Sequence, residues 1–309
     1  GLLTSDIRKV EFIGEQGKDL PPFTAGSHIN LTVADGKRRS YSLANDPAER
    51  HRYVIAVLRQ PNGEGGSAWI HDHLSLGDVV EASHPINNFS LHEKATDHLL
   101  IAGGIGITPL LSMAWALKSS GARATLHYCT RQPETTAFSG EIKDLFEDRV
   151  TFHHDGGDPS RGIDLKVVLA SPKNGTCLYI CGPAGLVDAA RQAAAHWPQD
   201  LVRYELFKAR DIDPADRKND QAFDIVLSRQ DRTITIAADK SILQTLQDLN
   251  MDVDFMCESG ICGTCRTKLL GGKADHRDDV LDEEEKSENT AIMICSSRAM
   301  PGETLILDL

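Results

Sequence analysis

The sequence predicts a chain of three modules: a small antiparallel β-barrel, a doubly wound parallel α/β domain and a C-terminal α+β module. Three observations predict this fold class. The first part has short strands separated by turns, the middle part alternates strands with helices, and the last part joins two strands and a helix to a cysteine-rich loop. A length of 309 residues fits two or three domains. We place the modules at residues 1–94, 95–207 and 221–309, with a linker at 208–220.

The first module is predicted from strands at residues 28–33, 39–43 and 53–58. Asp-Gly, Asn-Asp-Pro and Pro-Asn-Gly sequences separate these strands, and such sequences are typical of turns. A short helix is expected at residues 68–74. Many short strands without a long helical period favour a small antiparallel barrel.

The second module shows a different period. Strands are predicted at residues 98–102, 124–129, 150–153 and 177–180, and helices at 109–119, 139–147 and 183–196. Strands that alternate with helices indicate βαβ units and a parallel sheet. In such a sheet ligands bind outside the carboxyl ends of the strands.

The third module follows a polar, aperiodic stretch at residues 208–220, which we interpret as a linker. Strands are predicted at residues 223–227 and 233–236, and a helix at 241–249. A cysteine-rich loop comes next. No internal repeat or low-complexity tract is visible.

Four cysteines near the C-terminus are spaced C-x4-C-x2-C, with 29 residues before the fourth: Cys257, Cys262, Cys265 and Cys295. This spacing is typical of a plant-type 2Fe–2S cluster, whose irons are held by four thiolates. Gly260 lets the loop fold tightly, and amide N–H groups aimed at the sulfurs would tune the reduction potential. A zinc site is the alternative, but its ligands usually form two close pairs. A disulfide framework is disfavoured because cysteine is sparse.

The net charge of −12 is concentrated towards the C-terminus. Residues 221–309 contain 17 Asp or Glu against 9 Lys or Arg, a net charge of −8. A negative field argues against nucleic acid and favours a partner with a basic face. The acidic run at residues 282–285 is equally well explained as a solvated helix start or turn.

Cysteine use and the absence of a long apolar run suggest the cellular setting. Cys129, Cys177 and Cys181 remain as reduced thiols, which together with a cluster points to the cytoplasm. No apolar stretch approaches the roughly 20 residues that cross a bilayer. The chain begins with Gly1, so we expect that it was processed, tagged or cut from a longer protein.

A glycine-rich run from Gly103 to Pro109, Gly-Gly-Ile-Gly-Ile-Thr-Pro, follows a predicted buried strand and opens a helix. Such glycines let the backbone approach a phosphate, and the helix N-terminus supplies free N–H groups. The run is not G-x-G-x-x-G, and no acidic residue is cleanly placed to bind a ribose. A tight strand-to-helix turn without a ligand is the alternative.

Three shorter motifs carry weaker signals when they stand alone. In Arg39-Ser-Tyr-Ser the guanidinium can grip a phosphate and the tyrosine can stack on a flat ring. Gly65-Gly-Ser could hold phosphate at a helix start, or form a glycine turn with Ser67 as the helix cap. Cys181-Gly-Pro closes the last predicted strand, facing the ligand crevice or serving as a buried inert thiol.

Taken in chain order, these motifs and the cysteine spacing resemble those of the phthalate dioxygenase reductase family, within the ferredoxin–NADP reductase superfamily. The resemblance covers essentially all 309 residues. It implies an antiparallel Greek-key barrel that binds flavin, an NAD-binding α/β domain and a β-grasp ferredoxin domain.

For the first module the resemblance implies FMN rather than FAD. Arg39 would contact the flavin phosphate, Tyr41 the flavin, and Ser42 the region of its reactive ring nitrogen. Glu64 counts against this site unless it points away, because a carboxylate beside a phosphate is unfavourable. The implied flavin residues are Arg39, Ser40, Tyr41, Ser42, Leu58, Arg59, Gly65, Gly66 and Ser67.

For the second module the resemblance implies NADH. Ser42, Thr108 and Cys181 would form the hydride-transfer environment, and no residue is assigned as a general acid or base. Arg131 could meet the 2′-phosphate of NADPH, whereas Asp155 would repel it, which favours NADH. The implied NAD residues are Gly103, Gly104, Gly106, Thr108, Pro109, Arg131, Cys181, Gly182, Pro183, Glu205 and Phe207.

The function implied by the resemblance is electron transfer from NADH through FMN and the 2Fe–2S cluster to a partner oxygenase. The partner would most often be a Rieske non-haem iron oxygenase for an aromatic acid. A close alternative is the reductase part of a fused haem-thiolate monooxygenase. A stand-alone flavin or ferric reductase and a redox sensor are further alternatives. We expect a monomer that binds neither nucleic acid nor membrane.

Overall fold

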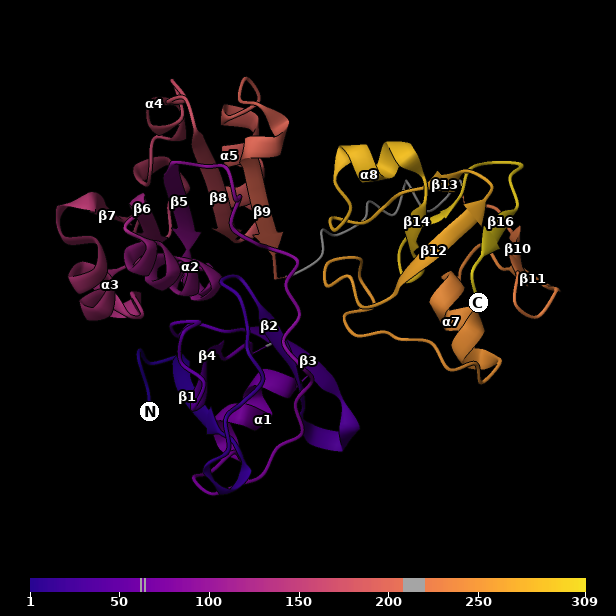
Figure 1. Ribbon diagram of the computed structural model, residues 1–309, viewed down its shortest axis with the longest axis horizontal. Helices are drawn as coiled ribbons and strands as arrows, with labels where there is room; N and C mark the ends of the chain where they lie inside the picture. Colours follow the sequence, from indigo (N-terminus) through magenta and orange to yellow (C-terminus); the bar gives the residue numbers. More distant parts are fainter. Residues whose placement is uncertain (62, 64, 208–219) are drawn as a thin grey trace. The chain divides into compact units, whose positions relative to one another are not determined.

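The computed structural model describes residues 1–61, 63, 65–207 and 220–309. It divides into two compact units, residues 1–207 and residues 208–309 (Figure 1). All but one residue of the predicted linker at 208–220 lies outside the described residues. No helix in the described ranges has the length and apolar character that crossing a membrane requires.

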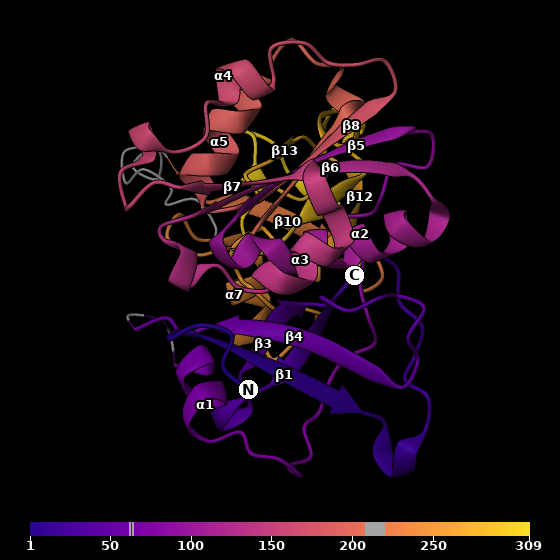
Figure 2. The ribbon, with the colours of Figure 1, turned by 90° about the vertical axis from the view of Figure 1, so that its left-hand side faces the viewer.

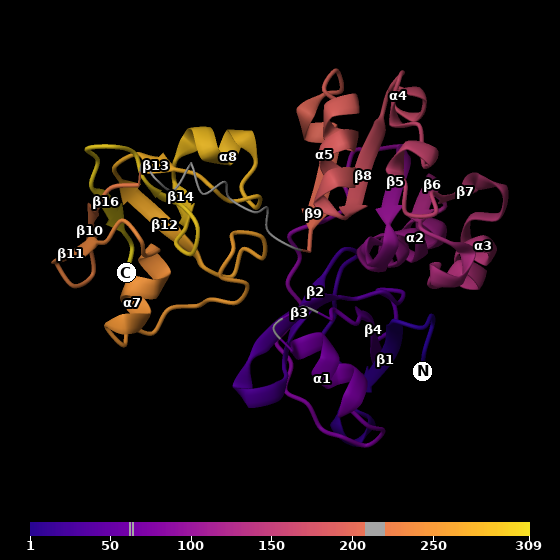
Figure 3. The same ribbon diagram turned by 180° about the vertical axis from the view of Figure 1, so that it is seen from behind.

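The barrel of the first unit is built from two antiparallel strand pairs. Strand β1 pairs with β4, and β2 pairs with β3. Isolated bridges join β2 to residues 82 and 86. The elements, with helix α1 beside the strands in Figure 3, are β1 (Ile7–Ile13), β2 (His28–Thr32), β3 (Arg38–Ser42), β4 (Arg52–Leu58) and α1 (Gly66–Asp72). Strand β1 was not predicted, because its apolar residues do not alternate strictly along the strand.

The second half of this unit is the predicted parallel sheet, in the order β7-β6-β5-β8-β9. Helices α2 and α3 pack on one side of it, and α5 packs against β8 and β9. The strands are β5 (Asp97–Gly103), β6 (Arg123–Thr130), β7 (Val150–His154), β8 (Thr176–Gly182) and β9 (Val202–Leu206). The helices are α2 (Ile107–Ser120), α3 (Ser139–Phe146), α4 (Leu165–Val168) and α5 (Ala184–Ala193). The doubly wound fold is confirmed, although β9 and α4 were not predicted.

The barrel and the parallel sheet share one apolar core. Ala56 of the barrel and Phe89 belong to the same buried cluster as Leu100 of β5 and Leu110 of α2. Strand β4 also contacts the turn Gly104–Gly106 that follows β5. Figure 2 shows β4 of the barrel below α2 and α3. The end of a barrel strand therefore lies against the start of the predicted nucleotide site.

The second unit contains a mixed five-stranded sheet in the order β11-β10-β16-β12-β14, as the β-grasp expectation requires. Helix α7 packs on it through Ile242 and Leu246, which share a core with Ile225 and Leu305. The elements are β10 (Phe223–Leu227), β11 (Arg232–Ile236), α7 (Ile242–Asp248), β12 (Arg266–Gly271), β13 (Ala274–Asp275), α8 (Glu283–Glu288), β14 (Ala291–Met293), β15 (Arg298–Ala299) and β16 (Leu305–Leu307).

The acidic run at residues 282–285 begins helix α8. Asp282 is the N-cap, and its carboxylate accepts a hydrogen bond from the Glu285 N–H at 2.8 Å. The Glu285 side chain in turn accepts from the Asp282 N–H at 3.1 Å. This reciprocal pair satisfies two backbone donors at the helix start. The helix-start interpretation of the run is therefore confirmed.

Candidate functional site

The carboxyl ends of β5 and β8 meet where the strand order of the parallel sheet reverses. Their loops touch backbone to backbone. A Cβ built on Gly106 would lie 2.3 Å from the Cys181 carbonyl oxygen, and one on Gly103 would lie 2.8 Å from Pro183 Cδ. Only glycine permits this approach, so at Gly106 the turn after β5 packs directly on the backbone at the end of β8. Glycine backbone at the start of a helix, at the carboxyl edge of the sheet, suits a pyrophosphate.

Cys181 and Glu205 are register partners on β8 and β9 at the same edge. Burial raises the pKa of the Cys181 thiol well above its usual value, and Glu205 adds to the shift. Burial also raises the pKa of Glu205 to about 8. Within the described ranges Glu205 Oε2 is buried without a hydrogen-bond partner, although other atoms of the residue reach the surface. An unsatisfied carboxyl oxygen beside a neutral thiol fits a planar ligand with a polar edge.

Thr108 and Leu58 lie close to the same turn. Thr108 is buried in the first turn of α2, next to Pro109, and its Oγ1 donates to the Ile105 carbonyl at 3.1 Å. Leu58, at the end of β4, packs against the same apolar cluster as Ile105 and Cys181. The structure thus brings the end of a barrel strand together with the glycine-rich turn and Cys181.

Arg131 and Asp155 occupy neighbouring loops at the ends of β6 and β7. The Asp155 N–H donates to the Thr130 carbonyl at 3.2 Å, and the Gly156 N–H donates to the Arg131 carbonyl at 2.9 Å. The Asp155 carboxylate accepts from the Gly157 N–H at 2.7 Å, which holds it in this loop. One cation and one anion therefore flank the edge where the ribose of a bound nucleotide is expected.

Two aromatic residues near the end of β9, Tyr204 and Phe207, have different surroundings. The Arg191 guanidinium lies over the Tyr204 ring, 4.2 Å from its centroid. Phe207, the last described residue of the first unit, is 40% exposed. Tyr204 is therefore engaged with α5, whereas Phe207 presents an apolar ring to its surroundings.

A cavity of about 240 Å³ adjoins Gly65 and Gly66 at the start of α1, and Lys37 and Trp69 are among its walls. Arg39 reaches the same place, since a Cβ on Gly66 would lie 2.9 Å from Arg39 Cγ. The cavity is also lined by Asp72, whose carboxylate is paired with Arg59. Two cationic side chains beside a glycine backbone and an indole ring fit a phosphate attached to a flat ring system.

The sequence analysis missed Lys37 and Trp69. Lys37 directly precedes Arg38 and Arg39, and Trp69 follows Gly65-Gly-Ser-Ala, so both stood next to predicted motifs. Neither position is distinctive in sequence. Only the folded chain brings the turn after β2 beside α1.

The remaining predicted flavin residues have defined partners. Burial raises the pKa of Tyr41 to about 12, so the phenol keeps its proton at neutral pH. Ser40 Oγ donates to Asn30 Oδ1 at 2.7 Å, and Ser42 is buried. The Arg59 guanidinium donates to both carboxylate oxygens of Asp72 on α1, at 2.6 and 2.8 Å.

Ser67 does not cap helix α1, so that alternative is wrong. Gly65 is the N-cap, with a φ of 90°, and no side chain caps the helix. Ser67 Oγ instead accepts a hydrogen bond from the Gln60 N–H at 3.0 Å. Glu64, which counted against a phosphate here, lies outside the described residues.

In the second unit the four predicted cysteines gather around one loop. Cys265 Sγ lies 3.1 Å from Cys295 Sγ, and the Cys257 N–H points at Cys262 Sγ at 3.4 Å. Hydrogen bonds from Cys262 and Cys295 lower the pKa of the Cys257 thiol. The same contacts raise the pKa of the Cys262 and Cys295 thiols, so the four sulfurs form one group in which Cys257 is the favoured thiolate.

Backbone donors surround these sulfurs. The Gly260 N–H reaches Cys295 Sγ at 3.2 Å, and the Ile261 N–H reaches Cys257 Sγ at 3.5 Å. Gly260 has a φ of 75°, and a Cβ there would lie 2.5 Å from Ser296 Oγ. Among the described residues Ser296 Oγ is buried and has no hydrogen-bond partner. N–H groups aimed at sulfur are the donors that an iron–sulfur cluster requires.

The cysteines fit a cluster better than a single ion. All seven cysteines of the chain are free of disulfides. In the part of the chain that the structure describes, no group of three or more His, Cys, Asp or Glu side chains converges on one metal ion. It is the spacing that disfavours the zinc alternative, because three close cysteines and one distant cysteine do not form two close pairs.

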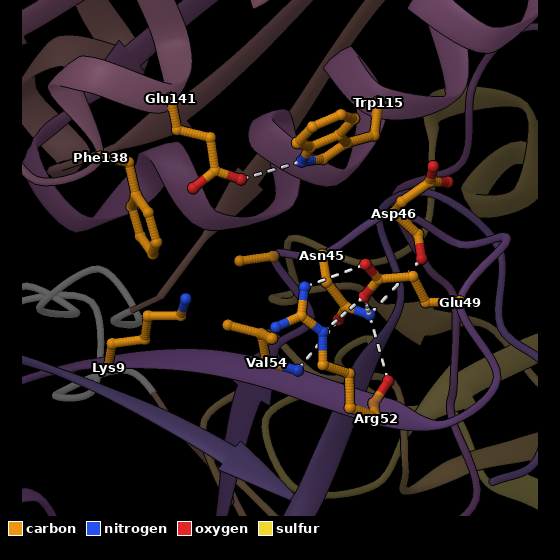
Figure 4. Close-up of a pocket in the computed structure, with 10 residues that line it drawn as sticks. Lys9, Asn45, Asp46, Glu49, Arg52, Val54, Trp115, Phe138 and Glu141 are labelled. Atoms are coloured by element: carbon orange, nitrogen blue, oxygen red, sulfur yellow. Dashed lines mark hydrogen bonds and ion pairs between the residues drawn. The ribbon is translucent and has the colours of Figure 1, made fainter. Parts of the chain in front are cut away.

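A second, small cavity of about 30 Å³ lies between the barrel and helices α2 and α3 (Figure 4). Trp115 Nε1 donates to Glu141 Oε1 at 3.1 Å on one side of it, and Arg52 pairs with Glu49 on the other. Its ten lining residues include none of the predicted site residues. This cavity, large enough for about one water, belongs to the seam between barrel and sheet.

Comparisons with known families and proteins agree with this geometry. The family "2Fe-2S iron-sulfur cluster binding domain" matches residues 225–300. The family "Dimethylamine monooxygenase subunit DmmA-like, N-terminal domain" matches residues 82–200. Phthalate dioxygenase reductase from Burkholderia cepacia is 46% identical over 99% of this chain and 94% of its own. The tert-butanol monooxygenase / tert-amyl alcohol desaturase reductase subunit from Aquincola tertiaricarbonis is 41% identical over 98% of this chain and 92% of its own.

Two solved structures are similar along the whole chain. The structure described as phthalate dioxygenase reductase, "a modular structure for electron transfer from pyridine nucleotides to [2Fe-2S]", has 45% identity and a TM-score of 0.73, covering 95% of that protein. An intact type IV self-sufficient cytochrome P450 monooxygenase has 36% identity and a TM-score of 0.91. This chain covers 40% of that longer protein.

Proposed function

The chain belongs to the phthalate dioxygenase reductase family, and on this premise we propose that it passes electrons from NADH through FMN and a 2Fe–2S cluster to a terminal oxygenase. It is an NADH-dependent oxidoreductase. One observation carries the proposal: a glycine-rich turn packed against both a barrel strand and Cys181 occurs in the same chain as a four-thiol loop. Together the bound cofactors would allow the two electrons of NADH to be passed on one at a time.

The barrel residues would hold the flavin by its charged end. Arg39 and Lys37 supply two positive charges beside Gly65 and Gly66, where a phosphate would be accepted. Tyr41, which keeps its proton, would lie against the ring system. Because FMN ends in a single phosphate, this pair of cations matches its charge without a second binding region.

The residues of the parallel sheet would hold NADH against that flavin. The backbone from Gly103 to Gly106 would accept the pyrophosphate, and Cys181 would lie beside the nicotinamide. Glu205 Oε2 would donate or accept one hydrogen bond at the carboxamide edge, since nothing else in the described ranges satisfies it. Asp155 would disfavour the extra phosphate of NADPH by charge repulsion.

The four thiolates of Cys257, Cys262, Cys265 and Cys295 would hold the two irons, with Gly260 N–H as a donor to one sulfur. The net charge of −8 over residues 221–309 supports a partner with a basic docking face. The partner proposed is a Rieske-type oxygenase component for an aromatic acid, bound by a monomer. Relatives named as phthalate and vanillate systems support this class.

A fused haem-thiolate monooxygenase is the second candidate, because the structural similarity to the self-sufficient cytochrome P450 has a TM-score of 0.91. In that case the electron acceptor would be a haem domain of the same polypeptide. The sequence of the gene upstream of Gly1 distinguishes the two: a haem-domain coding region supports fusion, and a start codon shortly before the Gly1 codon contradicts it.

An anaerobic titration with NADH, monitored by visible absorbance, tests the proposed electron path. We expect both flavin and iron–sulfur bands to bleach at low NADH, a weaker response to NADPH, and release of FMN on denaturation. Bleaching of the flavin alone would remove the cluster from the path, and release of FAD would contradict the cofactor assignment.

A further inference from the structure

Asp278 lies beside the cysteine loop and has no part in the electron path described above. It is 4% exposed, so its carboxylate is buried. Its Oδ1 accepts hydrogen bonds from the Val280 N–H at 3.1 Å and the Leu281 N–H at 2.8 Å. Its Oδ2 accepts from Ser297 Oγ at 3.2 Å. Three donors therefore hold one negative charge at a fixed place inside the second unit.

The turn that contains Asp278 contacts the cysteine loop at Gly260. The Asp279 N–H donates to the Gly260 carbonyl at 2.9 Å, and a Cβ on Gly260 would lie 3.2 Å from Asp278 Cα. On its other side Gly260 donates its own N–H to Cys295 Sγ at 3.2 Å. One residue thus separates the Asp278 turn from a sulfur that would bind iron.

Asp278 also reaches the chain on the far side of Cys295. Ser297, which donates to its carboxylate, lies two positions beyond that cysteine and is 1% exposed. Ser297 Oγ accepts in turn from the Arg277 N–H at 3.1 Å. Asp278 is therefore tied to both segments that determine where Cys295 lies.

The charge of Asp278 has no Lys or Arg partner within the described ranges. Its possible cationic neighbour there is His276, which is charged only when protonated. The neighbouring Arg277 guanidinium is directed at Asp220, at 2.6 and 3.0 Å, and at Asp275, at 2.7 Å. His276 Nδ1 is 3.8 Å from Asp278 Oδ2, too far for a hydrogen bond.

We propose that Asp278 is a positioning residue that also sets the reduction potential of the 2Fe–2S cluster. Its carboxylate holds Ser297 directly, and the turn that it caps holds Gly260 through the Asp279 N–H, so that both sides of Cys295 are fixed. Its buried charge disfavours the electron added on reduction. A negative charge in a poorly solvated interior acts more strongly than one in water. Burial and hydrogen bonds near the sulfurs are recognised determinants of such potentials. This inference rests on the proposed function, because it requires a cluster at the four cysteines.

The test is an anaerobic redox titration of the full-length protein, monitored by the electron paramagnetic resonance signal of the reduced cluster. Asp278→Asn keeps a carbonyl oxygen for the Val280 and Leu281 N–H groups but removes the charge. We expect the reduction equilibrium to shift about tenfold towards the reduced cluster, which is about 59 mV for a one-electron couple. Asp282→Asn is the matched control. It removes an exposed charge four positions away, and Asn can still cap α8, so we expect the wild-type potential.

A second measurement separates positioning from charge. Asp278→Ala removes all three hydrogen bonds, and we expect cluster absorbance to decay about fivefold faster in a chelator than in wild type or in Asp278→Asn. An unshifted potential in Asp278→Asn, or an equal shift in Asp282→Asn, would overturn the inference even if Asp278→Ala fails to fold. If the wild-type protein gives a cluster signal, the proposed function stands whether or not the potential of Asp278→Asn is shifted. A wild-type protein without one overturns both.

Discussion

Gly106 provides the sharpest test of the close contact between the loops after β5 and β8, because no space is left there for a Cβ atom. A Cβ at this position would lie 2.3 Å from the Cys181 carbonyl oxygen and 2.6 Å from the Gly182 nitrogen. Ordinary contact between heavy atoms needs about 3.5 Å, so in Gly106→Ala the two loops must separate by about 1 Å. Both neighbours are backbone atoms, which cannot rotate away as a side-chain end could.

Two consequences follow for Gly106→Ala. Overpacking of this kind costs about 1–3 kcal/mol of the free energy of unfolding. A displacement of about 1 Å beside the reacting groups reduces the rate about 100-fold. We therefore expect kcat/KM for NADH to fall about 100-fold, measured with ferricyanide as electron acceptor, and the urea midpoint of unfolding to decrease.

Gly185→Ala, in helix α5, is the matched control. A Cβ at Gly185 would have no atom within 4 Å, and the residue is exposed in α5. Alanine is favoured over glycine in helices by about 0.5–1 kcal/mol, so unfolding should shift to higher urea with kcat/KM unchanged. Wild-type kinetics and stability in Gly106→Ala would refute the claim that close backbone contact shapes this edge of the sheet.

Three further predictions follow from individual side chains. The pKa of Glu205 is raised to about 8 in the folded state, whereas in the unfolded chain this carboxyl has its usual pKa of 4.5. Between these values the folded protein retains a proton that the unfolded chain releases. The free energy of unfolding of wild type should therefore fall from about pH 5 to pH 8, relative to that of Glu205→Gln. Urea unfolding at both pH values checks this, and parallel profiles for the two proteins would contradict it. Cys295→Ser should keep NADH-driven bleaching of the flavin but lose the iron–sulfur bands and transfer to the partner, whereas unchanged turnover with the physiological acceptor would favour a stand-alone flavin reductase. Arg39→Ala should weaken flavin affinity about tenfold or more in equilibrium dialysis, because it removes a charge-assisted contact. Arg59→Ala, whose guanidinium is engaged by Asp72, should change that affinity much less.

Local sequence patterns were sufficient to predict many of the strands and the four cluster ligands. Alternation of apolar residues located β10 at the predicted residues, and the pattern of buried strands alternating with helices located β5 to β8 within two residues at each end. The cysteine spacing identified all four sulfurs: three lie within the nine residues from Cys257 to Cys265, and Cys295 follows at the distance typical of a plant-type cluster. Such features depend on neighbours in sequence, so a single chain can reveal them.

What the sequence by itself determined is the order of the modules and the residue types at the glycine-rich, arginine and cysteine motifs. Only the tertiary structure decided which distant groups meet: Lys37 with Gly66, Glu205 with Cys181, and Asp278 with Gly260. Glu205 illustrates the physical reason. Its identity is visible in sequence, but its raised pKa arises from burial, and burial is a property of the packed strands around it rather than of the residues beside it in the chain.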